Sequence, residues 1–281
     1  MAGRAALSVV VPTRDRHDHL TRCVAALRAD LGPDDELLVV DSASRTPVPG
    51  ALRCEPKGAS RARNAGWRAA QHDLVAFVDD DVEVRPGWAD ALVAALVGSS
   101  WVTGAVGVPT GQEDRERPVA VTTLTEPTRL TLASRGTLGA SANLGVRRSV
   151  LSAVGGFDER LGPGTWTRAA EDLDLLDRAL AAGFEGWFEP SAGAVHDQWR
   201  SRRQLVRLDH GYGIGLGVRL VLLHRAGSRG RARTVLRDAV WSGTVVTGAR
   251  DLAKGYQLGA LLAAVRLLGV VRGALLAVVR L

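Results

Sequence analysis

The strongest constraint on the fold is the alternation of short apolar runs with helix-like segments over the first hundred residues. Apolar residues at helical spacing predict helices over 19–31, 59–71 and 86–98. Four apolar runs between and around them predict strands: ALSVVVP (6–12), DELLVVD (35–41), DLVAFVD (73–79) and WVTGAVGVP (101–109). Strands that are apolar throughout are buried on both faces. This order therefore predicts an α/β fold with a mainly parallel sheet flanked by helices.

The remainder of the chain follows a different pattern. Residues 110–168 are irregular, 169–183 predict a helix that ends at a glycine, and 184–197 predict short extended pieces. From Gln204 the sequence is helical and basic, although the glycines of GYGIGLG (211–217) should weaken a helix locally. We therefore expect a body over 1–203 and a helical, basic extension over 204–281.

The charge distribution supports this division. Residues 200–281 hold 15 Arg and Lys against 3 Asp and Glu, a net +12, whereas the rest holds 21 against 27, a net −6. A basic segment favours anionic partners such as lipid headgroups or nucleic acid. The aromatic content of 5% and the lack of a base-stacking motif argue against nucleic acid.

The last segment, 256–281, is strongly apolar but is interrupted by arginines. Arg266, Arg272 and Arg280, together with Lys254, fall within about a third of the circumference of a helix. A spanning helix usually needs about 20 apolar residues with few charges. We therefore favour a helix that lies in the interface of an anionic membrane. Packing on the body or on a second subunit, and a true span, are the alternatives.

Cysteine content and the N-terminal sequence bear on the compartment. Two cysteines, Cys23 and Cys54, support neither a disulfide framework nor a zinc site and are typical of a reducing cytoplasm. The first apolar run is short and is better interpreted as a strand than as a signal peptide. We expect a cytoplasmic protein that is peripheral at the inner face of the cell membrane.

Three consecutive carboxylates, Asp79, Asp80 and Asp81, follow the third apolar run. If the strand geometry persists, Asp79 and Asp81 point to one face and Asp80 to the other. Two carboxylates on one face at a strand end suit Mg²⁺ or Mn²⁺. A solvated acidic turn is the alternative, and the buried strand before the triplet argues against it.

The triplet belongs to an ordered set of motifs: VVVPTRDR, VVDSAS, GASRARNAG, FVDDDV, GGFDE and AAEDLDL. With this set the chain resembles the family 2 glycosyltransferases, which have the GT-A fold, over about residues 6–200. The resemblance implies transfer of a sugar from a nucleotide-sugar donor to an acceptor hydroxyl. It also implies a divalent metal and inversion at the anomeric carbon.

The resemblance assigns the donor-binding residues. It implies that Asp79 reaches the ribose, with Asp80 either assisting or facing solvent, and that Arg14 stands where many members have an aromatic residue. It implies nucleotide or sugar contacts for Pro12, Thr13, Asp15, Asp41, Arg63 and Asn143, of which Asp41 would read the base edge. A surface arginine is the alternative for Arg63.

The metal and the base are assigned in the same way. Asp81 matches the metal-binding aspartate, and His196 is a second candidate ligand, with a purely structural histidine as the alternative. Asp172 in the pair Glu171-Asp172 matches the catalytic base. Carboxylates are also common at helix starts, because they interact favourably with the helix dipole. Asp174 is expected to be solvated.

The resemblance leaves some alternatives open. A nucleotidyltransferase, or a non-catalytic nucleotide-sugar sensor or membrane scaffold, would share much of this pattern. A dehydrogenase is disfavoured, because no G-x-G-x-x-G follows the first strand. The Q-x-x-R-W signature of processive synthases is absent, although QWR occurs at 198–200, so we expect one sugar per encounter. The expected acceptor is a glycan or a lipid-linked molecule of the cell envelope, and the oligomeric state stays open.

Overall fold

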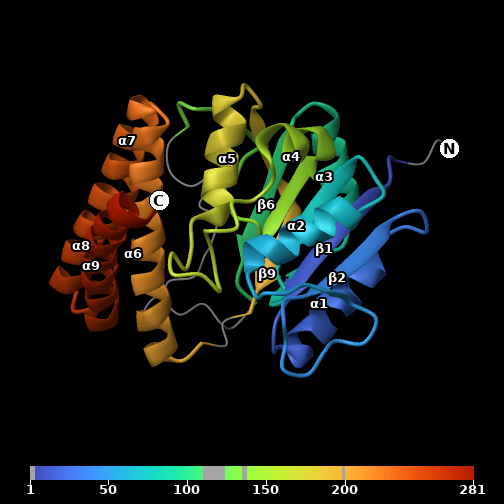
Figure 1. Cartoon of the computed structure of the whole chain (residues 1–281), viewed down its shortest axis with the longest axis horizontal. Coiled ribbons are helices and arrows are strands. Elements are labelled where there is room, and N and C mark those ends of the chain that lie inside the picture. Colours follow the sequence, from blue (N-terminus) through green and yellow to red (C-terminus); the bar gives the residue numbers. More distant parts are fainter. Residues whose placement is uncertain (1–3, 110–123, 135–137, 198–199) are drawn as a thin grey trace.

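One mixed sheet carries the body of the protein, and helices cover both of its faces (Figure 1). The computed structural model describes residues 4–109, 124–134, 138–197 and 200–281. The described strands lie in the order β3-β2-β1-β4-β8-β6-β9-β5, and β7 pairs with β9. Their bounds are β1 Leu7–Thr13, β2 Glu36–Asp41, β3 Leu52–Arg53, β4 Leu74–Val78, β5 Val82–Val84, β6 Trp101–Gly107, β7 Thr128–Leu130, β8 Asn143–Arg147 and β9 Gly186–His196.

The sheet is parallel in its first half and mostly antiparallel in its second. β3, β2, β1 and β4 run parallel, as the alternating pattern predicts. β8 then enters antiparallel between β4 and β6. β6 and β9 are parallel to each other, and β5 and β7 are both antiparallel to β9. The short extended pieces expected over 184–197 form one long strand, β9.

The helices enclose the sheet in two layers and then continue into a C-terminal group. Their bounds are α1 His17–Asp30, α2 Ala59–Ala69, α3 Trp88–Val97, α4 Arg148–Val154, α5 Glu171–Ala181, α6 Arg202–Arg225, α7 Arg229–Val235, the π-helix η1 Leu236–Val246, α8 Thr247–Ala253 and α9 Gln257–Arg280. Val9 and Val11 of β1 pack in a core with α1 and α3, whereas Val10 packs with α2, α4 and α5. Burial on both faces explains why the strands are apolar throughout.

These observations confirm the predicted fold class, a sheet flanked by helices with a C-terminal helical region. The parallel half agrees with the alternating pattern, and the antiparallel half departs from it. Residues 110–123, part of the segment expected to be irregular, lie outside the described residues, as do Gln198 and Trp199 of the QWR sequence.

The glycines of the segment 211–217 do not interrupt α6, which runs continuously through them. A Cβ atom at Gly213 would lie 2.1 Å from the carbonyl oxygen of Arg266, and one at Gly217 would lie 2.1 Å from that of Val270. Only glycine permits such close approach of two helix backbones. Tight packing of α6 against α9 therefore offsets the low helix propensity of these glycines.

One face of α9 packs against the rest of the protein, and the opposite face is exposed. By length and composition α9 could cross a membrane. Its exposed side chains form an apolar stripe: Leu261, Leu267, Leu268, Val271, Leu275, Val278 and Val279. Two of the arginines expected to form a free basic stripe are engaged instead. Arg266 pairs with the buried carboxylate of Asp209 on α6, and the guanidinium of Arg280 lies over the ring of Trp166.

A buried ion cluster attaches the C-terminal helices to the body, beside α5 (Figure 1). Arg219 of α6 donates to both carboxylate oxygens of Asp177, at 2.6 and 3.0 Å. Arg231 of α7 donates to the same carboxylate at 3.0 Å. All three side chains are buried. Asp177 lies on α5, the helix that begins with Glu171 and Asp172, so the extension contacts the helix of the expected base. The proposed domain boundary at 203/204 falls within the first turn of α6.

We expect Asp177→Ala to destabilise the protein by about 3–5 kcal/mol, because it leaves two buried guanidiniums without their counter-charge. The matched control is Glu83→Gln, which removes an exposed partner of Arg22 and should cost less than about 1 kcal/mol. Chemical denaturation followed by circular dichroism measures both. A cost for Asp177→Ala as small as that of the control would contradict the cluster's structural role.

Candidate active site

The acidic triplet forms a turn between β4 and β5, not an extension of the strand. The backbone N–H of Val82 donates to the carbonyl oxygen of Asp79 at 3.1 Å, which closes the turn. The expectation that Asp79 and Asp81 share one face is therefore wrong, because strand alternation ends at Val78. In the turn, Asp80 and Asp81 contact the same arginine, and Asp79 contacts a different one.

Asp80 is buried rather than solvent-facing, with 3% of its surface exposed. Its carboxylate accepts a hydrogen bond from the hydroxyl of Thr13 at 2.7 Å and one from Arg16 at 2.8 Å. Burial raises the pKa of Asp80, although Arg16 and Thr13 act in the opposite direction. Thr13, at the end of β1, is thus joined to the triplet.

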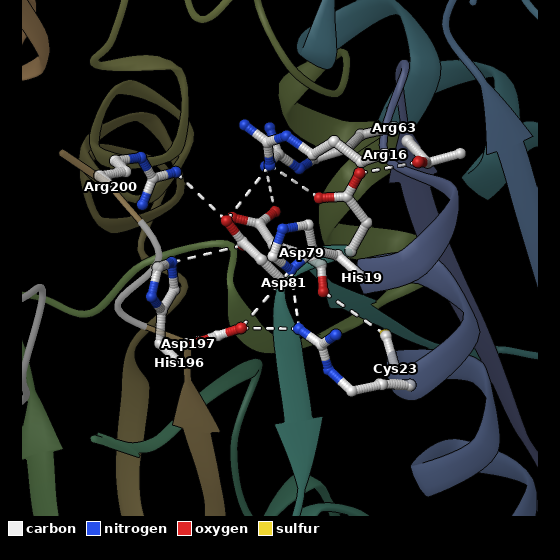
Figure 2. Close-up of polar contacts among 12 residues, drawn as sticks. Arg16, His19, Cys23, Arg63, Asp79, Asp81, His196, Asp197 and Arg200 are labelled. Atoms are coloured by element: carbon white, nitrogen blue, oxygen red, sulfur yellow. Dashed lines mark hydrogen bonds and ion pairs between the residues drawn. The ribbon is translucent and has the colours of Figure 1, made fainter. Parts of the chain in front are cut away.

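Asp81 is the most heavily paired member of the triplet (Figure 2). One carboxylate oxygen lies 3.2 Å from Arg16 and 3.2 Å from Arg200, and the other lies 3.3 Å from Nε2 of His196. Burial alone would raise the pKa of Asp81, but the hydrogen bond from His196 and the charges of His196 and both arginines hold it well below its usual range. Burial lowers the pKa of His196, and Asp81 more than offsets this, so the net shift is upward. Arginines therefore balance much of the crowded negative charge.

The neighbouring Asp81 and His196 side chains could hold a divalent cation. Mn²⁺ accepts both carboxylate oxygen and imidazole nitrogen, and Mg²⁺ prefers oxygen. Over the residues that the structure describes, no group of three or more His, Cys, Asp and Glu is arranged for a metal. Such an ion would therefore complete its coordination with water and ligand phosphate oxygens, as is common for Mg²⁺.

Arg63 joins the acidic triplet to the Glu171-Asp172 pair. It is 3% exposed, and it donates to Asp79 at 2.7 Å (Figure 2). It also donates to Glu171 at 3.1 Å. Its Nε finds no partner among the described residues. Burial lowers the pKa of Arg63, but the charges of Asp79 and Glu171 raise it more, so the side chain stays a cation. The arrangement brings three of the predicted site residues together and argues against a surface arginine.

The two carboxylates at the start of α5 have different surroundings. Glu171 is buried against Gly162, where a Cβ atom would lie 2.8 Å from the carboxyl carbon. Burial and the charge of Asp172 raise the pKa of Glu171 to about 7. Asp172 is half-buried, and it accepts hydrogen bonds from the backbone N–H groups of Leu173 at 2.7 Å and Ser141 at 3.3 Å. Asp172 is thus oriented and still reachable.

Two other predicted donor-binding residues lie on the first βα loops. Asp41 is buried, and its carboxylate accepts hydrogen bonds from the backbone N–H groups of Ser44 and Val48 and from Arg53. Burial opposes these contacts, which together lower the pKa of Asp41 to about 2. Asp15 is exposed and accepts from the backbone N–H of Arg45. These carboxylates order the loops.

Pro12 and Asn143 lie within the sheet. Pro12 is a buried residue of β1 beside Val40. Asn143 pairs with Val78 at the triplet end of β4, but its amide accepts from the indole N–H of Trp88 and donates to the carbonyls of Ala105 and Ala192. A contact between Asn143 and the donor is not supported, because its hydrogen-bonding groups already hold the sheet together.

The expectation for Asp174 is also wrong. This residue is buried on α5 and pairs with Arg178 one turn later, at 2.8 Å. Two arginines that contact the triplet, Arg16 and Arg200, were not among the predicted site residues. A search for counter-charges within a few residues of Thr13 and His196 would have found both.

Comparisons with known proteins agree with this geometry. The model of the glycosyl transferase family 2 matches residues 8–155. A pre-mycofactocin glycosyltransferase of Mycobacterium tuberculosis is 31% identical over 228 residues, covering 74% of this chain and 46% of that protein. An N-acetylglucosaminyl-diphospho-decaprenol L-rhamnosyltransferase of the same species is 30% identical over 248 residues, covering 69% and 77%. The chain thus spans about half the length of the first relative.

Solved structures show the same fold. A mannosyltransferase from Pyrobaculum calidifontis, in complex with GDP-Man and Mn²⁺, aligns with a TM-score of 0.63 at 18% identity, covering 97% of this chain and 88% of that one. TarS of Staphylococcus aureus, residues 1–349 with UDP-GlcNAc, aligns with a TM-score of 0.56 at 15% identity, covering 96% and 90%. The fold and the acidic site define a GT-A glycosyltransferase. The chain belongs to the family 2 glycosyltransferases.

Proposed function

We propose that the protein is a metal-dependent, inverting glycosyltransferase that moves one sugar from a nucleoside diphosphate sugar to an acceptor hydroxyl. The observation that carries this proposal is the double contact of Arg63, which joins Asp79 to Glu171 and so unites the acidic turn and the expected base in one site. Asp81 and His196 would hold Mn²⁺ or Mg²⁺, which would neutralise charge on the diphosphate leaving group.

Asp172 is the proposed base. As the acceptor oxygen attacks the anomeric carbon, its proton must be taken up within hydrogen-bond distance. Asp172 is half-buried, and its two backbone donors fix its orientation. An attack opposite the leaving diphosphate inverts the anomeric carbon. Glu171 is buried and stays beside Arg63, so it orients that arginine and holds charge rather than meeting the acceptor.

The arginines around the triplet support binding of a diphosphate. Arg16, in the loop after β1, contacts both Asp80 and Asp81. Arg200, in the segment before α6, contacts Asp81. Guanidiniums bind phosphate oxygens through two N–H groups at once. These two side chains are therefore placed to exchange a carboxylate contact for a phosphate contact when the donor binds.

Thermal shift with a panel of nucleotide sugars, with and without Mn²⁺, tests this function. A true donor at 100 times its Kd should stabilise the native state by about 2.7 kcal/mol. Only one base and sugar should do so strongly, and the reaction should release a nucleoside diphosphate. Release of pyrophosphate would instead indicate a nucleotidyltransferase, and binding without turnover a sensor.

We propose a lipid-linked or cell-envelope glycan as the acceptor. The name of the rhamnosyltransferase relative specifies an acceptor on a diphospho-decaprenol lipid. The exposed apolar stripe of α9 supports binding at the cytoplasmic face of an anionic membrane, with basic residues of the C-terminal helices at the headgroups.

Leu268→Glu/Leu275→Glu should lower binding to phosphatidylglycerol-containing vesicles at least about tenfold. Each change removes apolar area that the bilayer would bury and adds a negative charge that the anionic headgroups repel. Vesicle sedimentation measures this. The control, Val97→Glu/Leu132→Glu, changes two exposed apolar residues outside the C-terminal helices and should leave binding intact. Equal binding of both double variants would exclude α9 as the membrane-binding element.

The pH dependence of transfer should report the carboxylate pair. Because burial raises the pKa of Asp172, the base should become protonated, and transfer should fall, at a higher pH than for a solvent-exposed aspartate. Glu171→Gln removes a neighbouring negative charge, so the acid limb of kcat/KM should move to lower pH. A limb that stays in place would show that another group titrates.

A further inference from the structure

Two arginines near the active site have no counter-charge. Arg168 lies in the loop that leads into α5, and Arg272 lies on α9. Both are exposed, and neither has an ion-pair or hydrogen-bond partner within the described parts of the chain. In this they differ from Arg16, Arg63 and Arg200, each of which contacts a carboxylate.

The two arginines meet at one seam, where the loop before α5, α6 and α9 come together. A Cβ atom at Gly211 of α6 would lie 3.2 Å from Cβ of Arg168, so the arginine runs against α6 beside His210. A Cβ atom at Gly269 would lie 2.4 Å from the carbonyl oxygen of His210, and Arg272 follows Gly269 by one helical turn. The backbone of His210 therefore lies beside both segments that carry the two arginines.

The electrostatics of the seam agree with this placement. Burial lowers the pKa of His210, and the charges of Arg272 and Arg168 lower it further. Two guanidiniums that lie near each other without an ion-paired carboxylate repel each other, and a bound anion reduces that repulsion. The imidazole stays neutral at neutral pH, and so it can donate one N–H alongside the two guanidiniums.

The position of the seam indicates that the anion it binds is attached to a lipid. Arg168 precedes Asp172 by four residues, so their Cα atoms are at most about 15 Å apart. On its other side, Arg272 lies one turn from Leu268 and from Leu275, both exposed members of the apolar stripe of α9. An anion held here would have the proposed base on one side and an apolar surface on the other.

We propose that Arg168, His210 and Arg272 form a phosphate-binding site for a lipid-linked acceptor, which they hold with its hydroxyl toward Asp172 and its apolar chain along α9. This inference rests on the proposed function, which it deepens by naming the class of acceptor. Arginine suits the task because its planar fork matches phosphate oxygens.

Binding of farnesyl diphosphate in phosphatidylcholine vesicles tests the site. Arg168→Gln/Arg272→Gln should weaken binding at least about tenfold, because two charge-assisted contacts are lost. The control, Arg233→Gln/Arg250→Gln, removes the same charge from α7 and α8, where both arginines are exposed and make no ion pair with any described residue, and should weaken binding less than about twofold. Arg168→Lys/Arg272→Lys should restore part of the affinity.

Two further arms separate the sources of phosphate. Inorganic pyrophosphate should compete with farnesyl diphosphate, and phosphatidylglycerol vesicles should bind both Gln double variants equally. An equal loss of farnesyl diphosphate binding in both double variants would mean that the overall positive charge of the protein, and not a specific site at the seam, attracts the ligand. A selective loss on phosphatidylglycerol would assign it to lipid headgroups. Either result overturns the proposal.

The same variants distinguish this inference from the proposed function. Arg168 and Arg272 do not contact the acidic turn, so nucleotide-sugar binding should be unchanged in Arg168→Gln/Arg272→Gln. If the unmodified protein binds no nucleotide sugar, the proposed function fails whatever the result with farnesyl diphosphate. If it binds and turns over the donor, and the seam variant keeps farnesyl diphosphate affinity, only the acceptor site is wrong.

Discussion

Asp172→Asn should lower the rate of sugar transfer by about 10²–10⁴-fold, because it removes the group that takes the acceptor proton. Asparagine keeps the size of the side chain, and its one amide oxygen can still accept one of the two backbone N–H groups, from Leu173 or from Ser141. The loss should therefore appear in kcat, while the donor affinity measured by thermal shift stays within about twofold.

Asp174→Asn is the matched control, since it changes the same residue type two positions along the same helix. Asp174 pairs with Arg178 and has no contact with Arg63, so its loss should affect stability more than turnover. Both variants are compared for transfer and for unfolding. Transfer by Asp172→Asn that equals transfer by Asp174→Asn would remove Asp172 as the base.

Much of the body could be predicted because its local and global signals agree. The apolar runs at 6–12, 35–41 and 73–79 become β1, β2 and β4, of which β1 and β4 are fully buried and β2 is mostly half-buried beneath predicted helices. The antiparallel strand β8 could not be found this way. Its sequence, Asn-Leu-Gly-Val-Arg, is short and contains a glycine, and only pairing with β4 and β6 makes it a strand.

The glycines of α6 illustrate the opposite error. Helix propensity predicts a weak point at Gly213 and Gly217, yet both positions are needed where α6 and α9 touch. Propensity acts within one segment, and the compensating contact lies some fifty residues later in the chain. A prediction from helix propensity alone therefore counts the free-energy cost of these glycines but not the helix packing that offsets it.

The acidic residues of the candidate site, together with Arg63 and His196, could be predicted, whereas Arg16 and Arg200 could not. Motif order identifies Asp79, Asp81 and Asp172, because each stands at a strand or helix end. Motif order does not show that Asp80 is buried. The turn that buries Asp80 is closed by the hydrogen bond from the backbone N–H of Val82 to the carbonyl oxygen of Asp79. The counter-charges come from the loop between β1 and α1, from α2 and from the segment before α6, and the fold brings them together.

The positive charges around Asp81 suggest a test of whether this carboxylate binds a divalent cation. Asp81 faces Arg16, Arg200 and His196, so the carboxylate can serve either these cations or a divalent ion. If it serves a divalent ion when the donor binds, removing its charge should remove the dependence on that ion. The arginines would remain and could still attract a diphosphate.

We therefore expect Asp81→Asn to lower transfer at least about 100-fold and to make donor binding insensitive to Mn²⁺, since a ligand of the cation is lost. Asp80→Asn is the control: it loses the ion pair with Arg16 and one of the two acceptor oxygens that Thr13 and Arg16 use, and it should bind donor more weakly, yet still respond to Mn²⁺. Calorimetric titration of nucleoside diphosphate, with and without Mn²⁺, separates the two variants. An Asp81→Asn protein with the full Mn²⁺ response would mean that the cation is held elsewhere and that the triplet is an acidic turn neutralised by arginines.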